Sequence, residues 1–149
     1  MTKPAVPKSI VVYVDDDPDD ISLIEQSFMN LSKNIEIVTF QEGNHALSYL
    51  QNIGFQDPTP CLIILDINMP GLNGRDLLIR MRDNDHFKNV PIVLFSTSSS
   101  LRDKEFAKRY NAGFITKPLL LDQMNAITDQ FIEHCSEEHQ KNIRRGNKN

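Results

Sequence analysis

The chain has 149 residues, enough for one domain with a hydrophobic core, and 40% hydrophobic and 24% charged residues are usual for a globular protein. Its net charge of −4 excludes a general attraction to nucleic acid or anionic membranes. No apolar run is long enough to span a membrane, and the first residues lack the apolar core of a signal peptide. Cys61 and Cys135 show no metal-ligand spacing and suit a reduced compartment. These features predict a cytoplasmic protein.

Five short apolar runs, rich in Val and Ile, alternate with longer amphipathic segments. The runs are 10–14, 35–40, 61–65, 91–95 and 113–116. Runs that are almost continuously apolar are typical of strands buried on both faces of a parallel sheet.

Between and after these runs, apolar residues recur at helical spacing. They are Ile21, Ile24, Phe28 and Leu31; Ala46, Leu47, Leu50 and Ile53; Leu77, Leu78 and Met81; Phe106, Ala107 and Tyr110; and Leu120, Met124, Ile127, Phe131 and Cys135. Five strands, each followed by a helix, predict an α/β fold, a doubly wound (βα)5 sheet over residues 9–136. We expect the last helix to span about 120–138, residues 1–8 to form an N-terminal extension, and the basic residues 137–149 to form a frayed tail.

Polar residues follow four of the five predicted strands. They are Asp15, Asp16 and Asp17 after the first, Asp66 and Asn68 after the third, Ser96, Thr97 and Ser98 after the fourth, and Lys117 and Pro118 after the fifth. In open α/β sheets the functional crevice lies beyond the carboxyl ends of the strands. We therefore expect carboxylates, hydroxyls and a lysine to converge there.

Five carboxylates crowd into residues 14–20, the stretch VDDDPDD. Pro18 suits the first position of a helix, which makes Asp17 its N-cap. Asp19 and Asp20 then occupy the first turn, where the helix dipole favours negative charge. Helix capping accounts for these three acids and leaves the first two of the five without a structural role.

The two remaining acids, Asp15 and Asp16, are expected close to Asp66. Carboxylates about 5 Å apart repel by about 3 kcal/mol per pair at an effective dielectric constant near 20. A divalent cation offsets this repulsion, and an all-oxygen site favours Mg²⁺, or Mn²⁺, over zinc. We predict a metal held directly by Asp16 and Asp66, with Asp15 acting through water. The alternative is that one carboxyl group is protonated, or pairs with Lys117 without metal.

The same residues have the parts for phosphoryl transfer. The transferred group carries charge on three oxygens, and each needs a partner. The metal can bind one oxygen, Lys117 a second and the Ser96 hydroxyl a third. Asp66 would then be the nucleophile and form an acyl phosphate.

Residues 9–135 resemble the receiver domain of two-component response regulators. The resemblance rests on the acidic pair Asp15–Asp16, on LDINMPGLNG with Asp66, Pro70 and Gly74, on Ser96, and on Lys117–Pro118 in ITKP. It implies a flavodoxin-like sheet of order 2-1-3-4-5 and a phosphoacceptor, Asp66, that takes its phosphoryl group from a sensor histidine kinase or a phosphotransfer protein. The implied Mg²⁺ ligands are Asp16, Asp66 and the Asn68 backbone carbonyl, with Asp15 as the outer acid. Lys117 is implied to contact the phosphate and to precede a cis bond to Pro118.

The resemblance also implies roles for residues around the acceptor. Ser96 and Phe114 resemble the switch pair of the family, in which the hydroxyl moves toward the phosphate and the aromatic ring turns inward. Thr97 would contact the phosphate or narrow access to it. Asn68 and Ser98 resemble the positions that tune how fast the acyl phosphate hydrolyses.

The predicted function is that of a receiver-only phosphorelay protein, similar to the regulators that partner bacteriophytochrome-type kinases, and not that of an enzyme. Output would pass through contacts with an unknown downstream protein, without direct DNA binding or a membrane, and the last strand and helix could support a homodimer. A pseudo-receiver that never takes phosphate is the main alternative. A dinucleotide carrier lacks its G-x-G-x-x-G motif here, and a phosphatase of the haloacid dehalogenase type lacks its second acid.

Overall fold

The computed structural model of the protein describes residues 7–118 and 121–147. Its elements are β1 (Ser9–Val14), α1 (Pro18–Leu31), β2 (Ile35–Phe40), α2 (Gly43–Gln51), β3 (Leu62–Asp66), α3 (Gly74–Arg82), β4 (Ile92–Ser96), α4 (Leu101–Arg109), β5 (Gly113–Thr116), the 3₁₀ turn η1 (Leu121–Gln123), α5 (Met124–Ile132) and α6 (Glu137–Arg145). The strands form one parallel sheet of order β2-β1-β3-β4-β5. The predicted fold class and strand order are confirmed.

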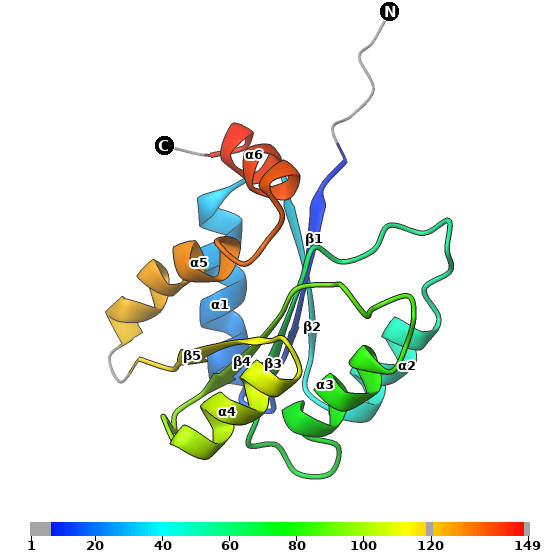
Figure 1. The fold of residues 1–149 in the computed structure, drawn as a ribbon. Helices are drawn as coiled ribbons and strands as arrows, with labels where there is room; N and C mark the ends of the chain where they lie inside the picture. The colour runs from blue at the N-terminus through cyan, green and yellow to red at the C-terminus, as the bar shows by residue number, and fades with distance from the viewer. Residues whose placement is uncertain (1–6, 119–120, 148–149) are drawn as a thin grey trace, which may run out of the picture.

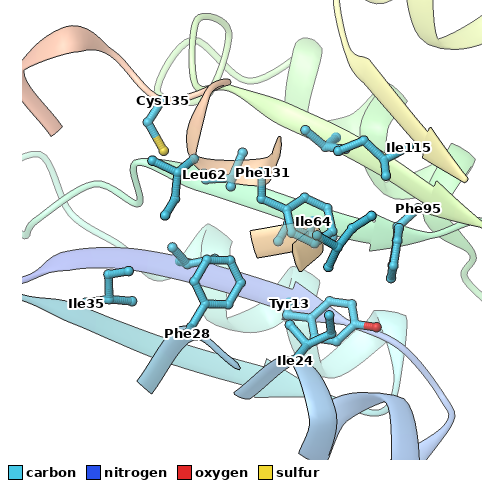
Figure 2. Packing of buried hydrophobic residues seen from close by; sticks show 14 of the residues in the cluster. Tyr13, Ile24, Phe28, Ile35, Leu62, Ile64, Phe95, Ile115, Phe131 and Cys135 are labelled. Carbon is cyan, nitrogen blue, oxygen red and sulfur yellow. The ribbon is translucent and has the colours of Figure 1, made fainter. Parts of the chain in front are cut away.

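Helices cover both faces of the sheet, with α1 and α5 on one side and α2 and α3 on the other (Figure 1). Each strand sends alternate side chains to opposite faces, so two hydrophobic cores form. One contains Phe28 from α1 and Phe131 from α5, whose ring centres lie 6.1 Å apart in a stacked arrangement, together with side chains of β1 and β3 such as Tyr13 and Ile64 (Figure 2). The other contains Leu50 and Leu77, and α4 adds Ala107 to it. The strands are therefore buried on both sides, as their continuous apolar runs predicted.

The helical stripes predicted from spacing lie against these cores. Each helix from α1 to α4 buries the predicted residues at its centre, while Leu31, Ile53, Phe106 and Tyr110 are only partly buried. Leu120 lies outside the described residues. None of the helices that the structure describes has the length and apolar character that a membrane crossing requires.

The C-terminal segment differs from the prediction. The helix expected over 120–138 ends at Ile132, and the tail expected to fray forms α6, which lies beside the start of β1 (Figure 1). Ser136 caps α6 by accepting from the backbone N–H of His139. Ile143 is completely buried in the core that α1 and α5 share. The prediction was wrong because it inferred a frayed tail from the basic charge of this segment. It overlooked the helix cap, Ser136, and the apolar residue that anchors the helix, Ile143.

Hydrogen bonds hold α6 to the amino-terminal end of the sheet. The Ser32 hydroxyl donates to the Ile143 carbonyl at 2.6 Å, and the Asn34 side chain donates to the Asn142 carbonyl at 2.8 Å. The Asn142 side chain in turn donates to the Ser9 hydroxyl at 3.0 Å. These contacts satisfy backbone groups between α1, β1 and α6 that would otherwise need water.

Candidate functional site

The candidate site lies where β1 and β3 end. Val14 and Leu65 are partners in the sheet, so the residues that follow them emerge side by side. Carboxylate oxygens of Asp15, Asp16 and Asp66 lie within 4.8 Å of one another. The structure therefore brings together the three acids that the sequence predicted to meet.

Asp15 is fully buried and firmly held. One of its carboxylate oxygens accepts from the Tyr13 hydroxyl at 2.5 Å, and the other accepts from the Asp17 backbone N–H at 3.0 Å. These hydrogen bonds give both buried oxygens a partner and hold the side chain in one orientation. Burial and the neighbouring Asp15 charge raise the pKa of the Tyr13 phenol, which keeps it a donor. Sequence analysis did not identify Tyr13, although its place two residues before Asp15 puts both on one side of the strand.

Lys117 is the buried cation of the site. Its Nζ lies 2.8 Å from Asp15, 3.0 Å from Asp20 and 3.4 Å from Asp66. Burial alone would lower the pKa of Lys117, but the hydrogen bonds and charges of these acids raise it above its ordinary value. The Nζ atom also lies over the Phe95 ring, 5.4 Å from its centre. Lys117 is therefore a fixed positive charge.

Asp20 was predicted to lie in the first turn of a helix, which is confirmed, but its role there was predicted incompletely. The N-cap role of Asp17 is confirmed, since its carboxylate accepts from the N–H groups of Asp19 and Asp20. Asp20, however, also pairs with Lys117. Side chains in a helix lean toward its N-terminus, so an acid in the first turn of α1 can reach back to the end of β1. This lean of helical side chains could have indicated from the sequence that Asp20 reaches the site.

Asp66 has a pKa that its surroundings raise. It is 5% exposed. Burial and the charge of Asp15 raise its pKa to about 6, while Lys117 and the Asn68 backbone N–H, which donates to Oδ1 at 3.1 Å, oppose the rise. At neutral pH the carboxylate is ionised at a cost, and any ligand that supplies positive charge relieves that cost.

Gly74 brings α3 directly against the backbone at the end of β3. A Cβ atom at this position would lie 2.4 Å from the Asp66 carbonyl oxygen, so a larger residue would displace the backbone that carries Asp66. The second glycine in LDINMPGLNG, Gly74, is thus explained by close packing.

The residues after β4 surround a buried hydroxyl. Ser96 is fully buried, and its Oγ accepts from the Ser98 backbone N–H at 3.1 Å and lies 3.5 Å from the Asn68 amide nitrogen. Thr97 is exposed. Phe114 is half-buried on β5, and it pairs with the β4 residue two places before Ser96, so the ring and the hydroxyl share one face of the sheet.

The donors present suit a hard divalent cation. Asp15, Asp16, Asp20 and Asp66 provide four carboxyl groups against the single ammonium of Lys117. All the candidate ligand atoms are oxygens, the preference of Mg²⁺ and Mn²⁺. Asp16 is exposed, so this side of the cluster is open to an ion, whereas both oxygens of Asp15 already accept hydrogen bonds. The arrangement fits direct binding by Asp16 and Asp66.

The expected cis bond before Pro118 is absent. No cis peptide bond occurs in the part of the chain that the structure describes, and both residues of Lys117–Pro118 belong to that part. The prediction was wrong because the isomer of an X–Pro bond is decided by its packing and not by the dipeptide.

Comparison with known proteins identifies the family. Residues 11–129 match the family model of the response regulator receiver domain. Response regulator Rcp1 of Synechocystis sp. is 29% identical over 105 residues, which cover 69% of this chain and 71% of that protein.

Two solved structures agree with this match. The phosphorylated cyanobacterial phytochrome response regulator RcpA has a TM-score of 0.78 at 29% identity, over 88% of this chain and 96% of that one. The Mn²⁺-bound form of response regulator Rcp1 has a TM-score of 0.73 at 25% identity, over 82% of this chain and 90% of that one. With the fold, the acidic cluster and the family model in agreement, the chain belongs to the response regulator receiver domain family of two-component systems.

Proposed function

We propose that this receiver domain accepts a phosphoryl group on Asp66 from a phosphohistidine of a sensor kinase or phosphotransfer protein. The observation that carries the proposal is a buried Asp66 carboxylate held 3.4 Å from the Lys117 ammonium, within a cluster that has more acids than cations. RcpA, a relative at 29% identity, was solved in phosphorylated form, which supports the same chemistry here.

In the proposed reaction an Asp66 carboxylate oxygen attacks phosphorus. The bond from phosphorus to the histidine nitrogen breaks, its electron pair stays on the imidazole, and an acyl phosphate forms on Asp66. Lys117 pairs with one phosphoryl oxygen, and the Ser96 hydroxyl donates to another. The exposed Thr97 lies beside Ser96 in the sequence and is assigned a further contact to the phosphoryl group.

A divalent cation completes the proposed site. Asp16, Asp66 and the Asn68 backbone carbonyl are assigned as direct ligands. Asp15 is assigned a contact to the metal through water. The cation, Mg²⁺ or Mn²⁺, would neutralise carboxylate and phosphoryl oxygens together. The Mn²⁺-bound form of Rcp1 supports a metal in this place. Lys117 already sits between the acids, so the residues are arranged before any ion binds.

Signalling is assigned to Ser96 and Phe114. The Ser96 hydroxyl is held by loop groups and lies on the same face of the sheet as Phe114. Its movement toward a phosphoryl group would vacate space for the aromatic ring and so favour a second conformation. Asn68 and Ser98, which flank that hydroxyl, are assigned the tuning of acyl phosphate lifetime. Output would pass through protein contacts near Ser96, Phe114 and α5, including a homodimer through β5 and α5.

Incubation with acetyl phosphate and Mg²⁺, followed by intact-mass measurement, tests the proposal without the unidentified kinase. The wild type is expected to gain about 80 Da, the mass of one phosphoryl group. Asp66→Asn and the EDTA-treated wild type are expected to gain none, and Asp16→Ala is expected to gain far less. Asp85→Asn, a change of an exposed acid outside the cluster, is the matched control and should label normally.

Equal labelling of wild type and Asp66→Asn would refute Asp66 as acceptor. A folded wild-type protein that gains no mass would instead indicate the alternative, a pseudo-receiver that works by binding alone.

A further inference from the structure

The two cysteines meet at the opposite end of β3 from Asp66. Cys61 directly precedes β3, and Cys135 lies in the corner between α5 and α6. Their sulfur atoms are 3.8 Å apart, and both side chains are buried. Figure 2 shows Cys135 at the edge of the core that α1 and α5 share, on the Leu62 side. Residues 74 positions apart in the sequence are thus brought within sulfur contact.

A cavity lies beside one of the two cysteines. It has a volume of about 260 Å³ and is lined by Cys61 together with polar residues that include His86, His139 and Asp85. His86 and His139 have hydrogen-bond partners of their own, the hydroxyls of Thr59 and Ser9. The cavity is large enough for a hydroperoxide and is lined in part by Cys61, whereas Cys135 is not among its lining residues.

The contact between the two sulfurs shifts the pKa values of the two thiols in opposite directions. The Cys135 thiol donates to Cys61, and this hydrogen bond lowers the pKa of the Cys61 thiol, although burial opposes the effect. The same contact and burial raise the pKa of Cys135. A thiolate is the reactive form of cysteine, so Cys61 is the sulfur suited to attack and Cys135 the one suited to follow.

We propose that Cys61 and Cys135 are a peroxide-sensitive thiol pair that closes into an intramolecular disulfide. In the first step Cys61 sulfur attacks one oxygen of a hydroperoxide; the O–O bond breaks, Cys61 becomes a sulfenic acid, and an alcohol or water leaves. In the second step Cys135 sulfur attacks Cys61 sulfur, and the hydroxyl leaves as water with the Cys135 proton. The sulfurs must close from 3.8 Å to about 2.05 Å, the length of a disulfide bond.

The disulfide would tie the α5–α6 corner to the start of β3. Reduced, these segments are joined by packing and by hydrogen bonds alone in the part of the chain described. Oxidised, a loop of more than seventy residues is closed, and closing so long a loop restricts the unfolded chain strongly. The proposal does not involve Asp66, so it stands or falls independently of the phosphoacceptor function.

The test uses the reduced full-length chain treated with hydrogen peroxide, then denatured and alkylated. The reduced protein should take up two alkyl groups and the oxidised protein none, and a tryptic peptide containing Cys61 should be joined to one containing Cys135. The thermal midpoint should rise by roughly 5–15 °C on oxidation and fall back with a reducing agent.

Two single variants test the order of the steps. Cys135→Ser should stop at a Cys61 sulfenic acid that dimedone traps, and Cys61→Ser should keep a peroxide-resistant thiol at Cys135. The wild-type measurements remain decisive if either variant fails to fold. Retention of both thiols in excess peroxide, linkage between two chains in place of one, or trapping at Cys135 before Cys61 would each overturn the proposal.

Discussion

The two ends of the sheet bury polar groups in contrasting ways. At the carboxyl end, the carboxyl groups of Asp15 and Asp66 and the ammonium group of Lys117 are buried, and acids outnumber the cation. At the amino end, Ser32 and Asn142 join α6 to β1 and α1 through neutral hydrogen bonds. The first arrangement leaves charge that a ligand can relieve, whereas these neutral hydrogen bonds leave no charge to relieve.

This difference separates the proposed phosphoryl chemistry from the packing of α6 within one small domain. Buried like charges cost free energy that the rest of the fold must offset, which is common where a site awaits a ligand. Neutral hydrogen bonds around a buried apolar side chain contribute modest stability without reactivity. Substitutions at the two ends should therefore move different measurements.

The largest effect is expected from Ile143→Ala in α6. Ile143 is fully buried, so its truncation leaves a cavity beneath α6 and should lower the free energy of unfolding by about 2–4 kcal/mol. Urea unfolding measures the change. Met29→Ala, a truncation at a half-exposed position, is the control and should stay within about 0.5 kcal/mol. If folded Ile143→Ala protein took up less phosphoryl group per molecule than the wild type, the two ends of the sheet would not be independent.

A change of opposite sign is expected from Asp66→Asn in metal-free buffer. The folded pKa of Asp66, about 6, lies above its ordinary 3.8, so the folded form holds the proton more tightly. The stability that this proton contributes is present below about pH 4 and is lost as the pH rises through 6. Above pH 7 the variant should be more stable than the wild type by roughly 2–3 kcal/mol.

Unfolding at pH 4, 6 and 8 with EDTA checks this prediction. The two proteins should converge toward pH 4 and diverge by pH 8, and added Mg²⁺ should narrow the gap by stabilising the wild type more. Asp85→Asn, at an exposed acid, is the matched control and should follow the wild type at every pH. Parallel curves for Asp66→Asn and wild type would show that the site carries no electrostatic cost.

The smallest effect is expected from Ser32→Ala. The Ser32 hydroxyl donates to the Ile143 carbonyl and accepts from the Asn34 backbone N–H, and it is buried. Removing the hydroxyl leaves the Ile143 carbonyl and the Asn34 N–H without this hydrogen-bond partner. The free energy of unfolding should fall by about 1–2 kcal/mol. Ser99→Ala, at an exposed serine, should change stability by less than about 0.5 kcal/mol. A Ser32→Ala protein as stable as the wild type would mean that water replaces these bonds.

Several features of the fold followed from local pattern. Every predicted strand lies within one residue of its observed bounds, because continuous apolar runs between turn residues leave few alternatives. The acidic trio was expected because parallel strands end at the same edge of a sheet. The role of Asp20 was missed because its partner, Lys117, lies 97 positions away in the sequence. Tyr13 was missed although it lies only two residues before Asp15 on the same side of the strand.

The alternation of apolar runs and amphipathic stripes determined the α/β architecture, and the positions of Asp15, Asp16, Asp66, Ser96 and Lys117 at strand ends determined where the site lies. Only the tertiary structure decided that Lys117 binds three acids, that residues 137–145 pack as α6, and that the two cysteine sulfurs touch. Local sequence sets local conformation and burial, whereas contacts between distant segments depend on packing that no single stretch encodes.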